Sequence, residues 1–96
     1  MTLSFAVAAA TSFERDFQKL AKRHESLLNA YERAVSTLKT DPYNRSRLHP
    51  IKKLTDVSPG NGQYRIRIGR WRFRYDIEGQ TVRLQYCGLR REDTYR

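Results

Sequence analysis

The stretch from residue 64 to residue 87 decides the fold. It reads YRIRI at 64–68, WRFRYDI at 71–77 and TVRLQYC at 81–87, and the runs are separated by Gly69-Arg70 and Gly79-Gln80. Side chains along a strand alternate between the two faces of a sheet, and a glycine supplies the positive φ that a two-residue hairpin loop needs. The pattern therefore predicts three antiparallel strands joined by two tight hairpins.

These strands have one apolar face and one cationic face. The apolar face is formed by Tyr64, Ile66, Ile68, Trp71, Phe73, Tyr75, Ile77, Val82, Leu84 and Tyr86, and the cationic face by Arg65, Arg67, Arg72, Arg74 and Arg83. Like charges directly across a ladder destabilise a sheet by a few tenths to about 1 kcal/mol each. So many arginines on one side therefore indicate a surface that binds phosphate, although many charged strand faces are merely solvated.

The hairpins also predict the register of the strands. Arg67 is expected opposite Arg72, Arg65 opposite Arg74, Asp76 opposite Arg83, Arg74 opposite Gln85, and Arg72 opposite Cys87. In this register only Arg83 is matched with a carboxylate. Cys87 falls on the arginine side, where cations favour a thiolate; it is either a reactive thiol or an ordinary strand residue.

Two amphipathic helices are expected before the strands. The first begins at Thr11, which has capping-box spacing to Glu14, and the second runs from Glu25 to Lys39 and ends before Pro42. Their apolar stripes are Phe13, Phe17, Leu20 and Ala21 in the first helix, and Leu27, Leu28, Tyr31, Ala34, Val35 and Leu38 in the second. Their short separation suggests an antiparallel pair.

The remaining segments are less regular. Residues 3–10 are either an opening strand or an irregular lead, and residues 43–63 form a polar connection with Leu48, Ile51 and Leu54 as anchors and a turn at 58–62. The fold class is α+β: a small antiparallel sheet packed on an N-terminal pair of helices, in the order (β)ααβββ, within a single domain spanning 1–96.

Charge and composition limit the kinds of partner and the compartment that the chain can be expected to have. The net charge of the 96 residues is +9, and residues 43–96 carry thirteen Lys or Arg against five Asp or Glu. Such a surface attracts nucleic acid or an acidic protein. A single cysteine, no export leader and no apolar run near the roughly 20 residues of a membrane span predict a cytoplasmic protein that does not enter a membrane.

Several kinds of catalytic site are not indicated. His24 and His49 are isolated, so no metal site and no cofactor are expected, and the turn at 58–62 lacks the lysine and helix of a phosphate loop. RNA cleavage needs no metal when the 2′-hydroxyl attacks its own phosphate. Arginine forks can then stabilise the charge, and a tyrosine such as Tyr95 can assist proton transfer.

The string from Gln63 to Arg96, preceded by HPIKKL and two short helices, resembles the RelE/ParE superfamily of toxins from toxin–antitoxin pairs. The resemblance implies a small sheet backed by two helices and a cognate antitoxin protein as partner. The RelE-like branch cleaves mRNA on the ribosome as a metal-independent mRNA interferase. The ParE-like branch instead binds and inhibits DNA gyrase.

By position, the resemblance implies catalytic roles for Arg65, Arg67, Arg72, Arg90 and Tyr95. Contacts to RNA are assigned to Lys52, Lys53, Arg74, Arg83 and Arg91. Related ribonucleases often have lysine where Arg65 and Arg67 stand, so the general acid is left open. We interpret the chain as an endoribonuclease; a gyrase inhibitor and a nucleic-acid-binding domain without catalysis are the alternatives.

Overall fold

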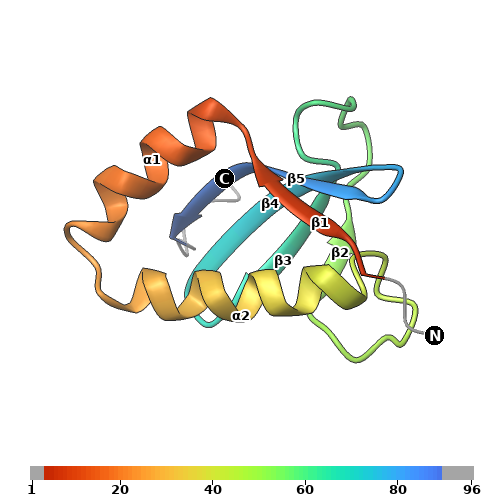
Figure 1. Cartoon of the computed structure of the whole chain (residues 1–96), viewed down its shortest axis with the longest axis horizontal. Helices are drawn as coiled ribbons and strands as arrows, with labels where there is room; N and C mark the ends of the chain where they lie inside the picture. The colour runs from red at the N-terminus through yellow and green to blue at the C-terminus, as the bar shows by residue number, and fades with distance from the viewer. Residues whose placement is uncertain (1–3, 90–96) are drawn as a thin grey trace.

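A computed structural model of the chain describes residues 4–89 (Figure 1), and within them it has two helices and one five-stranded sheet. The elements are β1 (Ala6–Ala9), α1 (Thr11–Ala21), α2 (Ser26–Thr40), β2 (Ile51–Lys53), β3 (Tyr64–Ile68), β4 (Trp71–Glu78) and β5 (Thr81–Leu89). The predicted α+β class and the order of helices before strands are confirmed.

The sheet differs from the prediction in two ways. Its strand order is β1-β5-β4-β3-β2, and β1 pairs in parallel with β5, so the sheet is mixed and not purely antiparallel. The opening strand was one of the two alternatives for residues 3–10. The short strand β2, which pairs with β3 inside the expected polar connection, was missed.

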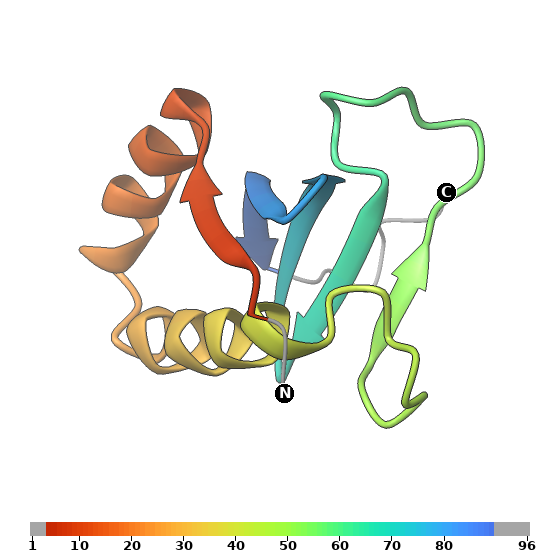
Figure 2. The same cartoon turned by 45° about the vertical axis from the view of Figure 1, so that its right-hand side comes forward.

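Both helices cover one face of the sheet (Figures 1 and 2). They diverge in a V from the short connection between them, with α1 beside β5 and α2 running across β3 and β4. The predicted helix ranges are confirmed to within a residue, but the capping box at Thr11 is wrong. The N-cap residue of α1 is Ala10, and no side chain caps this helix.

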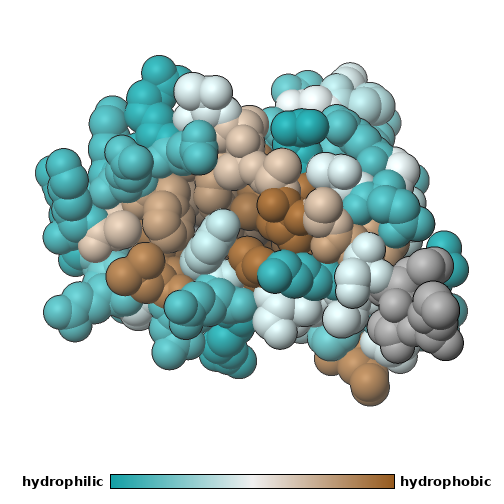
Figure 3. Space-filling model, viewed as in Figure 1, coloured by the Kyte–Doolittle hydropathy of each residue, from teal (hydrophilic) through white to brown (hydrophobic). Residues whose placement is uncertain are grey.

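The core lies between the helices and the predicted apolar face of the strands. Its buried hydrophobic residues are Phe13, Leu27, Ala30, Ala34, Leu38, Ile66, Ile68, Trp71, Phe73, Tyr75, Val82, Leu84 and Cys87. Half-buried side chains, among them Val7, Phe17 and Tyr31, pack around it. Figure 3 shows this helix side of the molecule, where apolar surface remains visible between α1, α2 and β1. Within residues 4–89, the second face of the sheet carries no helix.

Both predicted hairpin loops are present. Gly69 (φ 60°) and Gly79 (φ 61°) adopt positive φ at the first loop position, which only glycine does without strain. The first hairpin has the predicted register, with Arg67 opposite Arg72 and Arg65 opposite Arg74. The second keeps its predicted register only as far as Tyr75, where a bulge interrupts it.

The connection from α2 to β2 is ordered by two polar side chains. Asp41 accepts hydrogen bonds from the amides of Arg45 (2.8 Å) and Ser46 (3.2 Å), and the Asn44 side chain bonds to both the amide and the carbonyl of His49. Leu48 does not anchor this connection as predicted, because 81% of its surface is exposed. The part of the loop around Leu48 is held by hydrogen bonds.

Candidate nucleic-acid interface

The helix-free face of the sheet brings the predicted cations together. Arg65 and Arg67 on β3 lie directly opposite Arg74 and Arg72 on β4. These four residues form what we call the arginine block. Lys52 on β2 is opposite Arg65 and extends the cationic surface toward that edge of the sheet.

The block lies close to the sheet surface. All four arginines are half-buried, and the Nε atoms of Arg65 and Arg72 have almost no solvent exposure. A guanidinium whose inner nitrogen is enclosed keeps its planar fork in a restricted set of orientations. Such preorganised forks suit bidentate contacts to phosphate oxygens.

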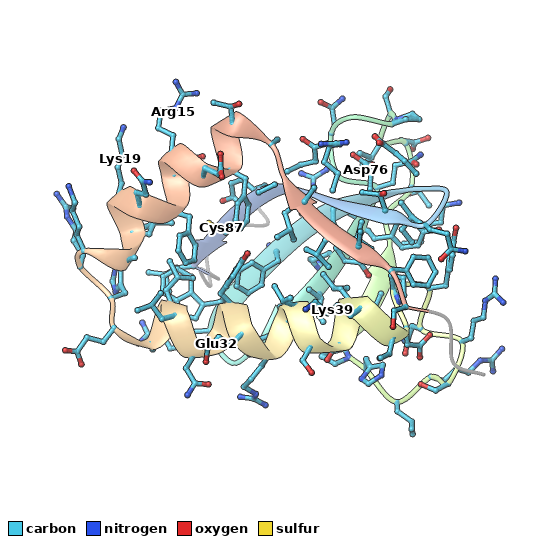
Figure 4. The ribbon with its side chains drawn as sticks, in the orientation of Figure 1. Arg15, Lys19, Glu32, Lys39, Asp76 and Cys87 are labelled. Carbon is cyan, nitrogen blue, oxygen red and sulfur yellow. The ribbon has the colours of Figure 1, made fainter. Side chains whose placement is uncertain are left out.

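Asp76 does not pair with Arg83 through its side chain, so this part of the prediction is wrong. The two residues are opposite in the ladder, but Asp76 is only 3% exposed. Its carboxylate accepts hydrogen bonds from the amides of Gly60, Gly62 and Gln63 at 3.1, 3.1 and 2.9 Å. Asp76 thereby holds the 58–63 loop against the cationic face, beneath the loop in the upper right of Figure 4.

This loop forms a wall at one end of the arginine block. Arg74 Nε donates to the carbonyl of Gly62 at 3.1 Å. A Cβ atom at Gly62 would lie 2.7 Å from the Cβ of Arg74, and Gly62 has φ +82°, so glycine is required here for both reasons. The guanidinium of Arg74 is therefore tied to the loop.

Arg83 lies on β5, on the side of the face away from Lys52, where it is opposite Asp76 in the ladder. Its Nε is 3.4 Å from Glu78 Oε1 in a solvent-exposed ion pair. The strands therefore place six cations, Lys52, Arg65, Arg67, Arg72, Arg74 and Arg83, against the two carboxylates of Asp76 and Glu78, a net of +4. The predicted concentration of positive charge on this face is thus present.

A β-bulge in β5 overturns the predicted facing of two residues. Tyr75 is opposite Leu84, but Arg74 is opposite Tyr86, so Gln85 has no ladder partner. The Gln85 amide instead donates to Asp76 Oδ2 at 3.1 Å. Beyond the bulge the faces are exchanged: Tyr86, predicted inside, is 45% exposed on the arginine side, and Cys87, predicted outside, is buried in the core.

The exchange creates a cleft beside the block. Arg72, Tyr86, Gly88 and, from α1, Asp16 and Lys19 line an open cavity of about 520 Å³. Arg72 is opposite Gly88, and the Tyr86 ring lies over that glycine, since a Cβ there would be 2.9 Å from Tyr86 Cζ. A phenol and a guanidinium therefore share one cleft, and Asp16 and Lys19 of α1 lie along its border. The sequence analysis did not place Tyr86 or Lys19 at a functional site. Gly88 was the local signal, because a glycine leaves room for the Tyr86 ring beside it.

Cys87 is a buried thiol that is only 2% exposed. Burial, and secondarily the negative charge of Asp16, raise its pKa to about 12. Figure 4 shows Cys87 in the interior beside α1, whereas Arg15 and Lys19 project outward from that helix. The thiol packs as a small apolar group, which is the second of the two predicted alternatives.

Arg90, Arg91 and Tyr95 lie outside the described residues. Within residues 4–89 no three His, Cys, Asp or Glu side chains are grouped so that they could hold a metal ion. Neither helix of that same part of the chain is long and apolar enough to cross a membrane.

Comparison of the chain with protein-family models, curated proteins and solved structures gave no match.

Proposed function

We propose that the chain is a metal-independent endoribonuclease, the toxin of a toxin–antitoxin pair, that cleaves mRNA on the ribosome. The observation that carries the proposal is the arginine block beside a cleft that contains the Tyr86 phenol. Phosphate recognition and proton transfer are the two requirements of RNA cleavage without a metal, and these residues supply both. The resemblance to the RelE/ParE superfamily adds the ribosome and the antitoxin to the proposal.

The reaction begins when the 2′-oxygen attacks the adjacent phosphorus atom. The new O2′–P bond forms as the P–O5′ bond breaks, leaving a 2′,3′-cyclic phosphate and a 5′-hydroxyl. Arg65, Arg67 and Arg72 hold the phosphate oxygens and stabilise the charge that develops on them. A phenol, that of Tyr86 or of Tyr95, relays the proton between the 2′-hydroxyl and the leaving oxygen, with Arg90 stabilising that oxygen.

The test is cleavage of a defined message on translating ribosomes, read by primer extension. Arg72→Ala should lower the single-turnover cleavage rate by at least about 100-fold, the usual effect of removing a group that stabilises a transition-state charge. Arg15→Ala is the matched control, because Arg15 is an exposed arginine that points away from the sheet (Figure 4). Equal rates for Arg72→Ala and Arg15→Ala would contradict the proposal.

Tyr86→Phe separates the two phenols. It keeps the ring over Gly88 and removes only the hydroxyl, so a loss of about 100-fold or more assigns proton transfer to Tyr86. An unchanged rate for Tyr86→Phe, with a loss for Tyr95→Phe, assigns it to Tyr95. No loss in either variant would refute the phenol mechanism.

Inhibition of DNA gyrase is the second candidate. Arginine is enriched over lysine at protein–protein interfaces, and the block consists entirely of arginine. In a supercoiling assay with purified gyrase, inhibition that is lost in Arg72→Ala, together with an intact message on ribosomes, would favour this function.

The antitoxin should present an acidic or amphipathic segment, because a cationic face of this size favours a partner with complementary charge. Its binding should weaken as ionic strength rises.

A further inference from the structure

A second cluster of cations and aromatic rings lies at the β2 edge of the sheet, on the helix side. Residues 42–55 contain Arg45, Arg47, Lys52 and Lys53 and no carboxylate. This segment follows α2 and contains β2, which pairs with β3 at the edge of the sheet (Figure 2). The proposed reaction uses none of its aromatic side chains.

The rings form a continuous series from the interior to the surface. Tyr75, which is fully buried, stacks on Tyr64 with 5.5 Å between ring centroids, and Tyr64 meets Tyr43 edge-to-face at 6.0 Å. Phe5 supports Tyr43 from another side at 6.2 Å. Tyr43 ends the series and is 40% exposed.

Cations already occupy the positions that a ligand would take. The guanidinium carbon of Arg45 lies 5.1 Å from the centre of the Tyr43 ring, and Lys53 Nζ lies 5.7 Å from the centre of the Tyr64 ring. Arg45 is itself exposed, so the Tyr43 face that it covers is reached from solvent. A planar nucleobase can stack on that face while Arg45 moves to an adjacent phosphate.

The rings of Tyr43 and Tyr64 form a platform that is preorganised. Tyr75 donates a buried hydrogen bond to the carbonyl of Pro42 at 2.8 Å, which fixes the residue before Tyr43. The Asp41 carboxylate accepts hydrogen bonds from the Ser46 hydroxyl (2.7 Å) and the Arg45 amide (2.8 Å), so the chain after Tyr43 is fixed as well. The ring therefore needs little ordering when a ligand binds.

The platform connects with the arginine block around β2. Lys52 is opposite Arg65, on the arginine side, and Lys53 is opposite Tyr64, on the platform side. A strand of three residues thus carries positive charge from one face of the sheet to the other, without an intervening carboxylate.

We propose that Tyr43, supported by Tyr64 and flanked by Arg45 and Lys53, is a stacking site for single-stranded RNA that continues past the edge of the sheet from the arginine block. The site binds an unpaired base by stacking and the backbone by charge. This inference rests on the proposed function in one respect only: the ligand is the same single-stranded RNA that the arginine block would bind. Because stacking accepts any base, it adds affinity without a sequence preference.

The test measures binding of fluorescein-labelled 2′-O-methyl oligonucleotides of increasing length, which cannot undergo attack by the 2′-oxygen. Tyr43→Leu should weaken binding of the longer oligonucleotides by roughly 5- to 150-fold, which corresponds to the usual loss of about 1–3 kcal/mol for one stacked base. Tyr43→Phe should bind as the wild type does, because it keeps the ring and its contacts. The affinity for duplex RNA should be the same in both variants and the wild type, since a paired base must first be unstacked before it can contact Tyr43.

The outcomes separate this site from the proposed reaction. If Tyr43→Leu and Tyr43→Phe bind every oligonucleotide equally, the stacking site is refuted, even if ribosomal cleavage is observed. If cleavage is absent but only Tyr43→Leu loses affinity, the stacking site stands and the reaction fails. If polyglutamate competes fully and the affinity depends on Arg45 and Lys53 but not on the ring, the surface is purely electrostatic and the proposal is wrong.

Discussion

Replacing Asp76 tests how the wall beside the arginine block is held. The carboxylate accepts four hydrogen bonds, three from backbone amides of the 58–63 loop and one from the Gln85 side chain. A hydrogen bond to a charged group contributes about 1.5–3 kcal/mol, and a buried donor left without an acceptor costs about 1–3 kcal/mol. The Gly62 amide is in a fully buried position, whereas the amides of Gly60 and Gln63 can regain water.

Adding one orphaned amide to the loss of charge-assisted bonding gives about 2.5–6 kcal/mol for Asp76→Ala. The melting temperature should fall by at least about 10 °C, since 1 kcal/mol corresponds to about 4–8 °C in a domain of this size. Asp76→Asn should lower the free energy of unfolding by about half as much. Its side chain keeps one acceptor oxygen, but its NH2 group faces one of the four donors and cannot accept that hydrogen bond.

Urea unfolding followed by circular dichroism measures these changes. Glu78→Ala is the control, since it removes an exposed carboxylate from the same strand and should cost less than about 1 kcal/mol. If Asp76→Ala and Glu78→Ala lower the free energy of unfolding equally, the hydrogen bonds of Asp76 do not hold the loop and the reasoning fails.

Three further predictions concern Tyr75, Cys87 and Asp41. Tyr75→Phe removes the hydrogen bond to the Pro42 carbonyl and should lower the free energy of unfolding by about 1–3 kcal/mol, measured by the same urea titration. Cys87, with its pKa raised to about 12, should not react with a thiol reagent at pH 8 until urea unfolds the protein; rapid labelling of the folded protein would contradict its burial. Burial tends to raise the pKa of Asp41, but hydrogen bonds from the Ser46 hydroxyl and the Arg45 and Ser46 amides, with the nearby His49, leave it below its ordinary 3.8. This stabilisation is present above pH 3.8 and is lost as the pH falls through the folded-state pKa, so the difference in unfolding free energy between wild type and Asp41→Asn should shrink as the pH falls below 3.8.

The sheet face could be predicted because its determinants are local. Gly69 and Gly79 set two-residue loops, and those loops with the period of two fix which side chains are opposite and which share a face. Nothing beyond residues 64–83 was needed to place Arg65, Arg67, Arg72 and Arg74 together. The helices were predictable for a similar reason, since their apolar stripes and the proline after α2 are local signals.

Features that depend on distant partners could not be predicted in the same way. Ile51–Lys53 has only three residues and no alternation that distinguishes it from a loop, so its pairing with β3 is a tertiary effect. Leu48 was expected to be buried because it is apolar, but Asp41 and Asn44 order its loop and leave nothing for it to pack against. The role of Asp76 was also hidden, because its partners are backbone amides 13 to 16 residues away.

The bulge at Gln85 has the largest consequence for the site. An uninterrupted strand would bury Tyr86 and turn Cys87 toward the arginines, as the alternation predicts. One extra residue reverses this order, and it is tolerated because β1 pairs only with Thr81–Leu84, so the second half of β5 has no described strand on its other side. The amide of Gln85 binds Asp76, the same carboxylate that holds the 58–63 loop. A single buried acid therefore supports both the wall and the bulge, and through the bulge it places the Tyr86 phenol in the cleft with Arg72. Loss of Asp76 should consequently impair the proposed cleavage reaction, even in protein that stays folded and although Asp76 lies outside the arginine block.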